Sequence, residues 1–212
     1  MDPTCAHPYL AADLLQGLEI LEQQWRRLGA PIASNLRAGL SARDIDRLAE
    51  PSGLTIPPEL RIWWAWHDGA GPAAGAPRDS ATIGPGRLTF LGLQESLDAA
   101  AWNRSVHAKS DDMGSIYWRD TWLPFLIRDS TRVYVDCSEA TPLGYSPLRV
   151  VVWEWAQFNV VRAPSLTAAV HLWAQLLEDD HYRIAALPRD GSPTWEYDYG
   201  RLPMDARMSG LV

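Results

Sequence analysis

The chain has 212 residues, a formal net charge of −7, 47% hydrophobic residues and 21% charged residues. This composition is typical of a globular protein, and the length is enough for one domain with a buried core. Because phosphate contacts dominate nucleic-acid affinity, an acidic chain with a single lysine and no basic run is a poor candidate for binding DNA or RNA.

The first part of the chain predicts three helices. Leucines and one tryptophan recur every three or four residues from 8 to 28, as on one face of an amphipathic helix. Ser41, with Asp44 three residues later, matches a capping box and predicts a second, short helix. A third helix is expected from about Pro58 to His67.

The composition of the middle of the chain predicts mostly irregular structure. Residues 69–87 are rich in Gly, Ala and Pro, so we expect a loop with little fixed structure. Residues 87–93 predict a short strand that runs into a helix at 94–101, and the polar residues 103–115 predict another loop.

Beyond residue 120 the hydrophobic period changes to two, which indicates strands. A hairpin is expected around Arg128–Thr131, followed by strands at 148–156 and 158–163. Ser165 then begins a helix with an apolar stripe, and 192–202 predicts an irregular or hairpin-like tail. Helices first, then neighbouring strands with short connections, then a closing helix indicate an α+β fold with antiparallel pairing.

The stretch RIWWAWHDG, at residues 61–69, places three tryptophans in four positions at the end of the third helix. At about 100° per residue, Trp63 and Trp64 share a stripe with His67, while Trp66 points to the other side. We therefore expect Trp63 and Trp64 inside the protein and Trp66 nearer the surface.

His67 and Asp68 are the first candidates for acid–base chemistry. His67 is expected in the last helical turn, Asp68 in the following loop with bonds to backbone N–H groups, and Gly69 at the helix end. A catalytic role needs a nucleophile or third group in reach, and no motif supplies one. Asp136 ends a predicted strand, where a carboxylate serves as a base, as a metal ligand or, more often, as the cap of a turn. The sequence favours structural or interaction roles for all of them.

The other tryptophans are assigned by their surroundings. Trp118 and Trp122 flank the predicted hairpin and are expected to be partly exposed, and Trp195 is expected to pack on an edge. A core position is expected for those on apolar helix stripes or on one strand face: Trp25, Trp102, Trp153, Trp155 and Trp173.

Other site classes lack their motifs. The sequence has neither GxxxxGK[ST] nor GxGxxG, so nucleotide binding is not indicated. Its cysteines, Cys5 and Cys137, form no zinc-binding pattern. The sequence shows no signal-peptide pattern and no run of roughly 20 apolar residues. We expect a cytoplasmic protein without metal, cofactor or membrane contact.

Four blocks follow one another along the chain: GLSARDIDRLAEPSGLTIPPELRIWWAWHDG, FLGLQESLDAA, TWLPFLIRDSTRVYVDCS and APSLTAAVHLWAQLL. In kind and order they resemble the SMI1/KNR4 domain of the SUKH superfamily, over roughly residues 10–180. Members often carry glycines in the hairpin turn, where this chain has RDST at 128–131. A role that depends on glycine at that turn is therefore in doubt.

The resemblance implies an α+β fold with a central, mostly antiparallel, twisted sheet flanked by helices, and a non-catalytic, protein-binding role. Bacterial relatives are mostly thought to be immunity proteins that neutralise toxins, many of them nucleases, and fungal relatives act as regulatory scaffolds. The net charge fits a basic toxin domain as the partner. Partner contacts are then expected at Trp66, His67, Asp68, Trp122, Tyr134 and Asp136, and structural positions at Trp63, Trp64, Gly69, Pro124 and Phe125.

The resemblance assigns residues 1–180 to one domain and 181–212 to an extension that packs on it or is partly mobile. Three other functions stay open, of which the first is a regulatory scaffold domain. A hydrolase would use His67 with Asp68, or Asp136, in a pocket. A sensor of small ligands would have a tryptophan-lined pocket.

Overall fold

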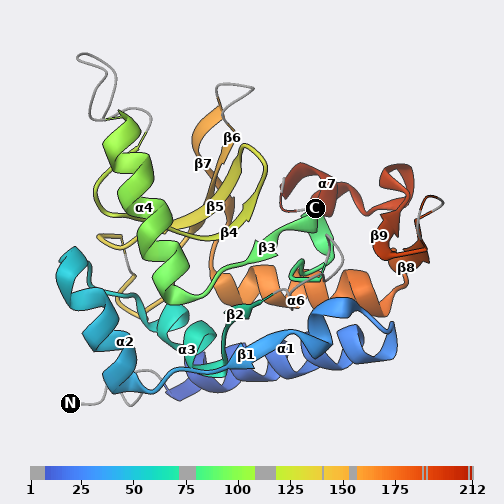
Figure 1. Ribbon diagram of the computed structural model, residues 1–212, viewed down its shortest axis with the longest axis horizontal. Helices are drawn as coiled ribbons and strands as arrows, with labels where there is room; N and C mark the ends of the chain where they lie inside the picture. Colours follow the sequence, from blue (N-terminus) through green and yellow to red (C-terminus); the bar gives the residue numbers. More distant parts are fainter. Residues whose placement is uncertain are drawn as a thin grey trace.

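The computed structural model describes most of the chain as an α+β fold, which confirms the expected fold class (Figure 1). Within the described ranges, no helix is long and apolar enough to cross a membrane. The described residues are 8–71, 80–107, 118–139, 141–152, 157–187, 189, 191–209 and 211.

The centre of the fold is a five-stranded sheet of order β3-β4-β5-β6-β7, with every neighbouring pair antiparallel. The predicted hairpin is present, with Asp129 and Ser130 between its two strands. Asp129 adopts a positive φ of 43°, which aspartate tolerates better than most residues, so the turn forms without glycine. The strands are Thr89–Phe90 (β3), Trp122–Arg128 (β4), Thr131–Asp136 (β5), Leu148–Val152 (β6) and Gln157–Ala163 (β7).

Two long helices, α1 (Pro8–Arg27) and α6 (Leu166–Glu178), lie side by side below the sheet in Figure 1. The predicted cap of α6 is present, because the Ser165 hydroxyl accepts the Ala168 N–H at 3.0 Å. The other helices are α2 (Ala42–Ala49), α3 (Pro58–Trp66), α4 (Leu93–His107) and α7 (Met204–Ser209), with 3₁₀ helices at Pro31–Ser34, Glu50–Ser52, Pro85–Arg87 and Tyr199–Arg201.

The cap of α2 also forms as predicted. The Ser41 hydroxyl accepts the Asp44 N–H at 3.1 Å, which satisfies one of the backbone donors that a helix start leaves unpaired. A local sequence pattern was enough to locate this helix start.

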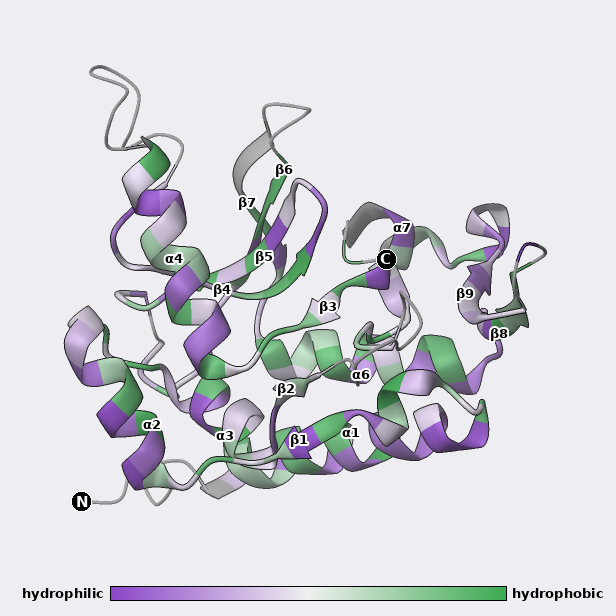
Figure 2. Ribbon diagram, viewed as in Figure 1, coloured by the Kyte–Doolittle hydropathy of each residue, from purple (hydrophilic) through white to green (hydrophobic). Residues whose placement is uncertain are grey.

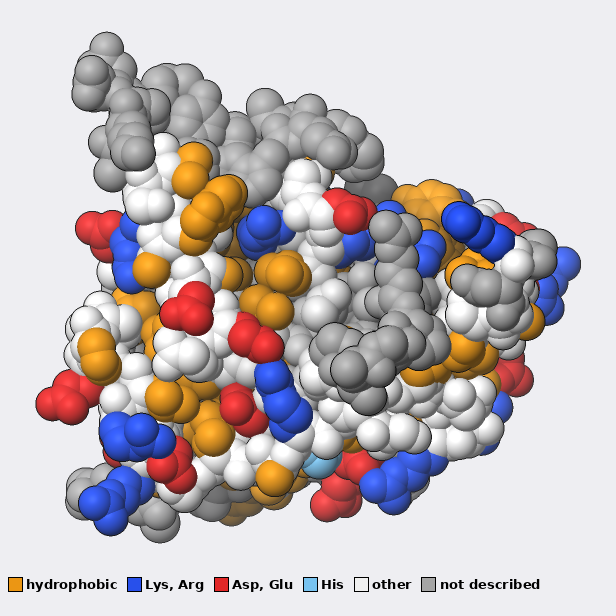
Figure 3. Space-filling view, viewed as in Figure 1, with side chains coloured by type: hydrophobic (Ala, Val, Ile, Leu, Met, Phe, Trp, Pro, Cys, Tyr) orange, Lys and Arg blue, Asp and Glu red, His pale blue; other side chains and the backbone are white. Residues whose placement is uncertain are grey.

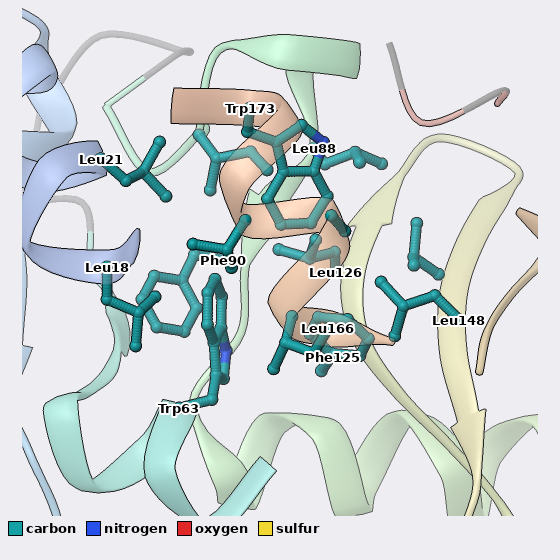
Figure 4. Packing of buried hydrophobic residues seen from close by; sticks show 14 of the residues in the cluster. Leu18, Leu21, Trp63, Leu88, Phe90, Phe125, Leu126, Leu148, Leu166 and Trp173 are labelled. Atoms are coloured by element: carbon teal, nitrogen blue, oxygen red, sulfur yellow. The ribbon is translucent and has the colours of Figure 1, made fainter. Parts of the chain in front are cut away.

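Helix α3 supplies aromatic residues to the core. Figure 4 shows Trp63 beside Phe90 and Phe125, with ring centroids 4.5 and 5.8 Å away. Trp63 and Trp64 are both 0% exposed, whereas Trp66 is only partly buried, which confirms their predicted order. Figure 2 shows hydrophobic residues along β6 and α6, whereas α2, α4 and the C-terminal hairpin carry residues of both kinds.

The end of α3 differs from the prediction. The helix stops at Trp66, and His67 has extended dihedral angles (φ −146°, ψ 137°). His67–Ala70 forms strand β2, which pairs antiparallel with β1 (Leu36–Ala38). The expected last turn at His67 and helix end at Gly69 are therefore wrong, because a distant strand binds this backbone. Gly69 has a φ of +78° within β2, which favours glycine.

Part of the expected Gly/Ala/Pro loop is fixed in the core, contrary to the prediction. Thr82 and Ile83 are buried, and their carbonyl oxygens accept the indole N–H groups of Trp195 and Trp25 at 3.2 and 3.0 Å. Two distant tryptophans thus hold a segment whose composition indicated little structure. Residues 72–79 lie outside the described part of the chain.

The C-terminal segment packs on the rest of the protein. Strands β8 (Tyr182–Ala186) and β9 (Pro193–Tyr197) form an antiparallel hairpin. The predicted hairpin-like segment, 192–202, supplies only β9, because its partner strand lies before it in the chain. Trp195 is 3% exposed and belongs to the main core, deeper than the expected edge position. The Trp173 indole donates to the Leu211 carbonyl at 3.3 Å, so the last described residue is also attached.

Candidate functional site

The dipeptide His67–Asp68 lies where β1, β2 and the first turn of α4 meet. The Asp68 carboxylate accepts the Leu93 N–H at 2.7 Å, one of the donors that the start of α4 leaves unpaired. Asp68 thus bonds a backbone N–H, as predicted, but in a distant helix instead of its own loop. Glu95 reaches back from the same turn and accepts the Gly92 N–H at 2.7 Å, as in a capping box.

Gly92 has no room for a side chain that could cap α4 itself. A Cβ atom there would lie 2.5 Å from the Arg37 guanidinium and 2.8 Å from the Asp68 carbonyl oxygen. Asp68 therefore supplies from β2 the acceptor that the residue before α4 cannot carry.

Arg37 connects the three elements. Its guanidinium donates to both carboxylate oxygens of Glu95, at 3.0 and 2.7 Å, and to the Asp68 carbonyl. The bond to Glu95 raises the pKa of Arg37, although burial opposes this. Burial alone would raise the pKa of Glu95, but the bonds from Arg37 and Gly92 outweigh it and leave that pKa below its usual value. Both charges are stabilised by the junction.

His67 has bonding partners at both ring nitrogens. Nδ1 lies 2.8 Å from the Arg37 carbonyl, an acceptor, so Nδ1 carries a hydrogen. Nε2 lies 3.3 Å from the Glu22 carboxylate. The ring also packs edge-on against Trp66 at 4.5 Å. Within the described residues, His67 joins β2 to β1 and α1.

The second predicted group, Trp122, Tyr134 and Asp136, comes together on the sheet. Trp122 pairs with Asp136 across β4 and β5, and its indole donates to that carboxylate at 3.1 Å. The rings of Trp122 and Tyr134 stack at 4.4 Å, with Trp118 against both at 5.5 Å.

These side chains are covered rather than available. Exposed fractions are 1% for Trp122, 0% for Tyr134 and 3% for Asp136, and Trp118 is also buried. The expectation that Trp118 and Trp122 are partly exposed is therefore wrong. The structure gives Trp122, Tyr134 and Asp136 no surface for direct partner contact.

Asp136 caps the turn after β5, the role the sequence favoured. One oxygen accepts the Ser138 N–H at 3.0 Å and its hydroxyl at 2.6 Å. Burial opposes ionisation, but bonds from Ser138, Thr121 and Trp122 outweigh it and hold the pKa of Asp136 below its usual value. Burial also raises the pKa of the neighbouring Cys137 thiol to about 12, the opposite of an activated cysteine.

The two predicted groups lie on opposite faces of the sheet. Side chains alternate along β4, so Trp122 and Pro124 face away from Phe125, which belongs to the main core. Trp63 and Trp66 pack on the Phe125 side through Phe90 and Phe125 itself. The structure therefore does not join all predicted residues into one site.

The outer side of α4 carries an exposed aromatic residue that the sequence prediction placed in the core. Trp102 is 58% exposed and Val106, one turn later, is 42% exposed. The helix also continues to His107, beyond the expected end at residue 101, so the loop predicted from 103 begins too early. Residues 108–117 lie outside the described part, as do Trp153 and Trp155.

Helical phase gave a signal that the prediction did not use. The buried residues of α4 include Leu93, Leu97 and Ala100. At about 100° per residue, Trp102 lies roughly 140° from Leu97 and 160° from Ala100 around the helix axis. This phase places Trp102 on the side of α4 opposite the buried residues.

Glu59 is a second residue that the sequence did not single out. It is 0% exposed, and its carboxylate accepts the N–H of Ser146 at 2.7 Å and both the N–H and hydroxyl of Thr167 at 2.8 and 2.7 Å. Burial raises the pKa of Glu59, against these bonds. It attaches α3 to the first turn of α6.

A groove of about 410 Å³ lies at the β8–β9 hairpin. Its lining is polar and charged, unlike the tryptophan-lined pocket of the sensor hypothesis, and includes Arg183, Glu196 and Arg201. Among the described residues, no group of three or more His, Cys, Asp or Glu side chains is placed to hold a metal ion.

No protein-family model matches the chain, and no curated protein matches it at a significant level. The resemblance to the SMI1/KNR4 domain stays a prediction from sequence blocks.

Proposed function

We propose that the chain is a non-catalytic protein-binding module of the SMI1/KNR4 type that binds a basic partner, such as a nuclease-type toxin domain. The observation that carries this proposal is the bonding of the acid–base candidates. His67, Asp68 and Asp136 all use their polar atoms to join secondary-structure elements, Asp136 through the indole of Trp122.

A general base must reach the proton of a substrate, or of a nucleophile beside it. Nδ1 of His67 is bonded to the Arg37 carbonyl, and Nε2 faces the Glu22 carboxylate. The two ring nitrogens therefore face a backbone carbonyl and a carboxylate. A catalytic histidine would instead face the hydroxyl or thiol of a nucleophile, as in a Ser–His or Cys–His pair. This arrangement supports a structural role for His67.

The charge of the chain supports a basic partner. A net charge of −7 attracts positively charged proteins over distances up to about a Debye length, and it opposes contact with nucleic-acid phosphates. Occupying the basic cleft of a nuclease would exclude its substrate. Inhibition would follow from binding alone, without any reaction by this chain.

The test is capture of a partner, followed by inhibition. Tagged protein, incubated with extract from the source cells, is expected to retain a basic protein whose release needs high salt. The purified partner should lose its nuclease activity when the chain is added in equimolar amount. Absence of a stable basic partner would contradict the proposal.

The hydrolase alternative gives a different result. Replacing His67 by Ala would then abolish turnover of a substrate while leaving the melting temperature unchanged. We expect the opposite, a lower melting temperature and no change in any turnover, because His67 joins three elements.

A further inference from the structure

We propose that the outer face of α4 is the docking surface for the partner, with Trp102 as its apolar anchor and a partner surface that sets basic side chains around an apolar recess. The inference rests on the proposed function, because it names the surface through which the chain binds.

The outer face of α4 is a continuous stripe along the helix. The opposite side packs into the protein through Leu93, Leu97 and Ala100, and α4 contacts β4 and α2. Figure 3 shows hydrophobic and acidic side chains together over α4 on the face toward the viewer, with basic side chains beside them. The exposed residues of the stripe are Gln94, Glu95, Asp98, Ala101, Trp102, Ser105 and Val106.

Trp102 differs from every other tryptophan that the structure describes. The others are buried or, for Trp66, partly buried, whereas Trp102 is 58% exposed. Val106 extends the apolar surface by one helical turn. Tryptophan is among the residues most enriched at binding hot spots, because one side chain fills a recess with a large apolar area.

Two charges favour a basic occupant: the carboxylate of Asp98 beside Trp102 and the net charge of −7 of the whole chain. Asp98 lies one turn before Trp102, and its carboxylate accepts the Gln94 amide at 2.9 Å. Glu95, one turn further back on the adjoining side of the helix, pairs with Arg37. On the flank, Arg104 donates to the Asp120 carbonyl at 3.0 Å. A second copy of this chain would bring a net charge of −7 against the same acids, so charge favours a basic partner over self-association.

The first test uses a defined probe. An amphipathic helical peptide of leucine and lysine presents an apolar stripe between basic residues, and its leucine–glutamate counterpart presents the same stripe between acids. Titration calorimetry should detect binding of the lysine peptide and much weaker binding of the glutamate peptide. Equal binding of both peptides, or no binding of the lysine peptide, overturns the inference.

Variants locate the contact. Trp102→Ala should lower the affinity for the lysine peptide by at least about tenfold, as expected for a hot-spot residue. Asp98→Asn should lower this affinity by a smaller factor and make the affinity less dependent on salt concentration. The matched control is Leu143→Ala, which removes a 63% exposed apolar side chain from the segment after β5 and should change nothing. Equal affinity of Trp102→Ala and the unchanged protein overturns the inference.

The captured partner separates this inference from the proposed function. If Trp102→Ala and Val106→Asp lose the partner while keeping the circular-dichroism spectrum, the inference holds. If both variants retain it, the surface is wrong and the binding function stands. If the unchanged chain captures no basic partner, both fail. Sedimentation should show a monomer, and a dimer that Trp102→Ala dissociates would mean that a second copy occupies the face.

Discussion

Helices α3 and α4 both carry tryptophan, and they place it differently. Helix α3 is surrounded: Trp66 meets Trp25 of α1 at 5.9 Å, Trp63 meets Phe90 and Phe125 of the sheet, and Glu59 bonds to α6. Helix α4 packs on one side only and leaves Trp102 exposed on the other. The number of neighbouring elements, rather than residue type, decides whether a tryptophan serves the core or a surface.

The largest expected effect is in α3. Trp64→Ala removes a side chain that is 0% exposed and leaves the Leu91 carbonyl without the indole donor 3.1 Å away. We expect a loss of about 3–5 kcal/mol in the free energy of unfolding, measured by urea denaturation. A loss below about 1 kcal/mol would mean that α3 is not enclosed.

Glu59→Ala is expected to have the next largest effect. It leaves the buried donors of Ser146 and Thr167 unpaired, at a cost of about 2–4 kcal/mol. Glu59→Gln keeps the shape and one acceptor oxygen and should cost less.

The pH dependence of Glu59→Gln tests the buried charge. Because burial raises the pKa of Glu59 above its ordinary 4.5, the folded state binds the proton more tightly than the unfolded state. The contribution of Glu59 to stability is therefore complete below pH 4.5 and declines as the pH rises through the raised pKa. Relative to the unchanged protein, Glu59→Gln should gain stability from pH 4 to pH 8. The opposite trend would mean that the donors outweigh burial.

A smaller effect is expected at the start of α4. Asp68→Ala removes the acceptor of the Leu93 N–H and should cost about 1 kcal/mol. Hydrogen exchange should accelerate at the first amides of α4. Ser41→Ala, which removes the cap of α2, is the matched control and should accelerate exchange there instead. Unchanged exchange in α4 after Asp68→Ala would contradict the cap.

The smallest effect on stability is expected at Trp102. Trp102→Ala should change the free energy of unfolding by no more than about 0.5 kcal/mol, because the side chain is mostly exposed. Thermal unfolding of Trp102→Ala and Trp64→Ala under the same conditions compares the two positions directly. A loss similar to that of Trp64→Ala would place Trp102 in the core.

Local patterns predicted the elements whose structure depends on their own residues. The period of α1, the cap at Ser41, the cap at Ser165 and the hairpin around Asp129 all appear as expected. The order of Trp63, Trp64 and Trp66 also followed from helical phase alone.

Features that depend on distant partners could not be predicted. His67 became a strand because β1 pairs with it, and Thr82 is fixed by the indole of Trp195, 113 residues away. Glu59 likewise bonds to residues far along the chain, and a glutamate in the first turn of a helix gives no local sign of burial.

Hydroxyl-radical footprinting with mass spectrometry measures the oxidation of each tryptophan separately and tests the contrast between the two helices most directly. The structure predicts that Trp102 is oxidised much faster than Trp63 and Trp64, and that the captured partner protects Trp102. Oxidation of Trp63 as fast as that of Trp102 in the free protein would contradict the division between an enclosed α3 and an open α4.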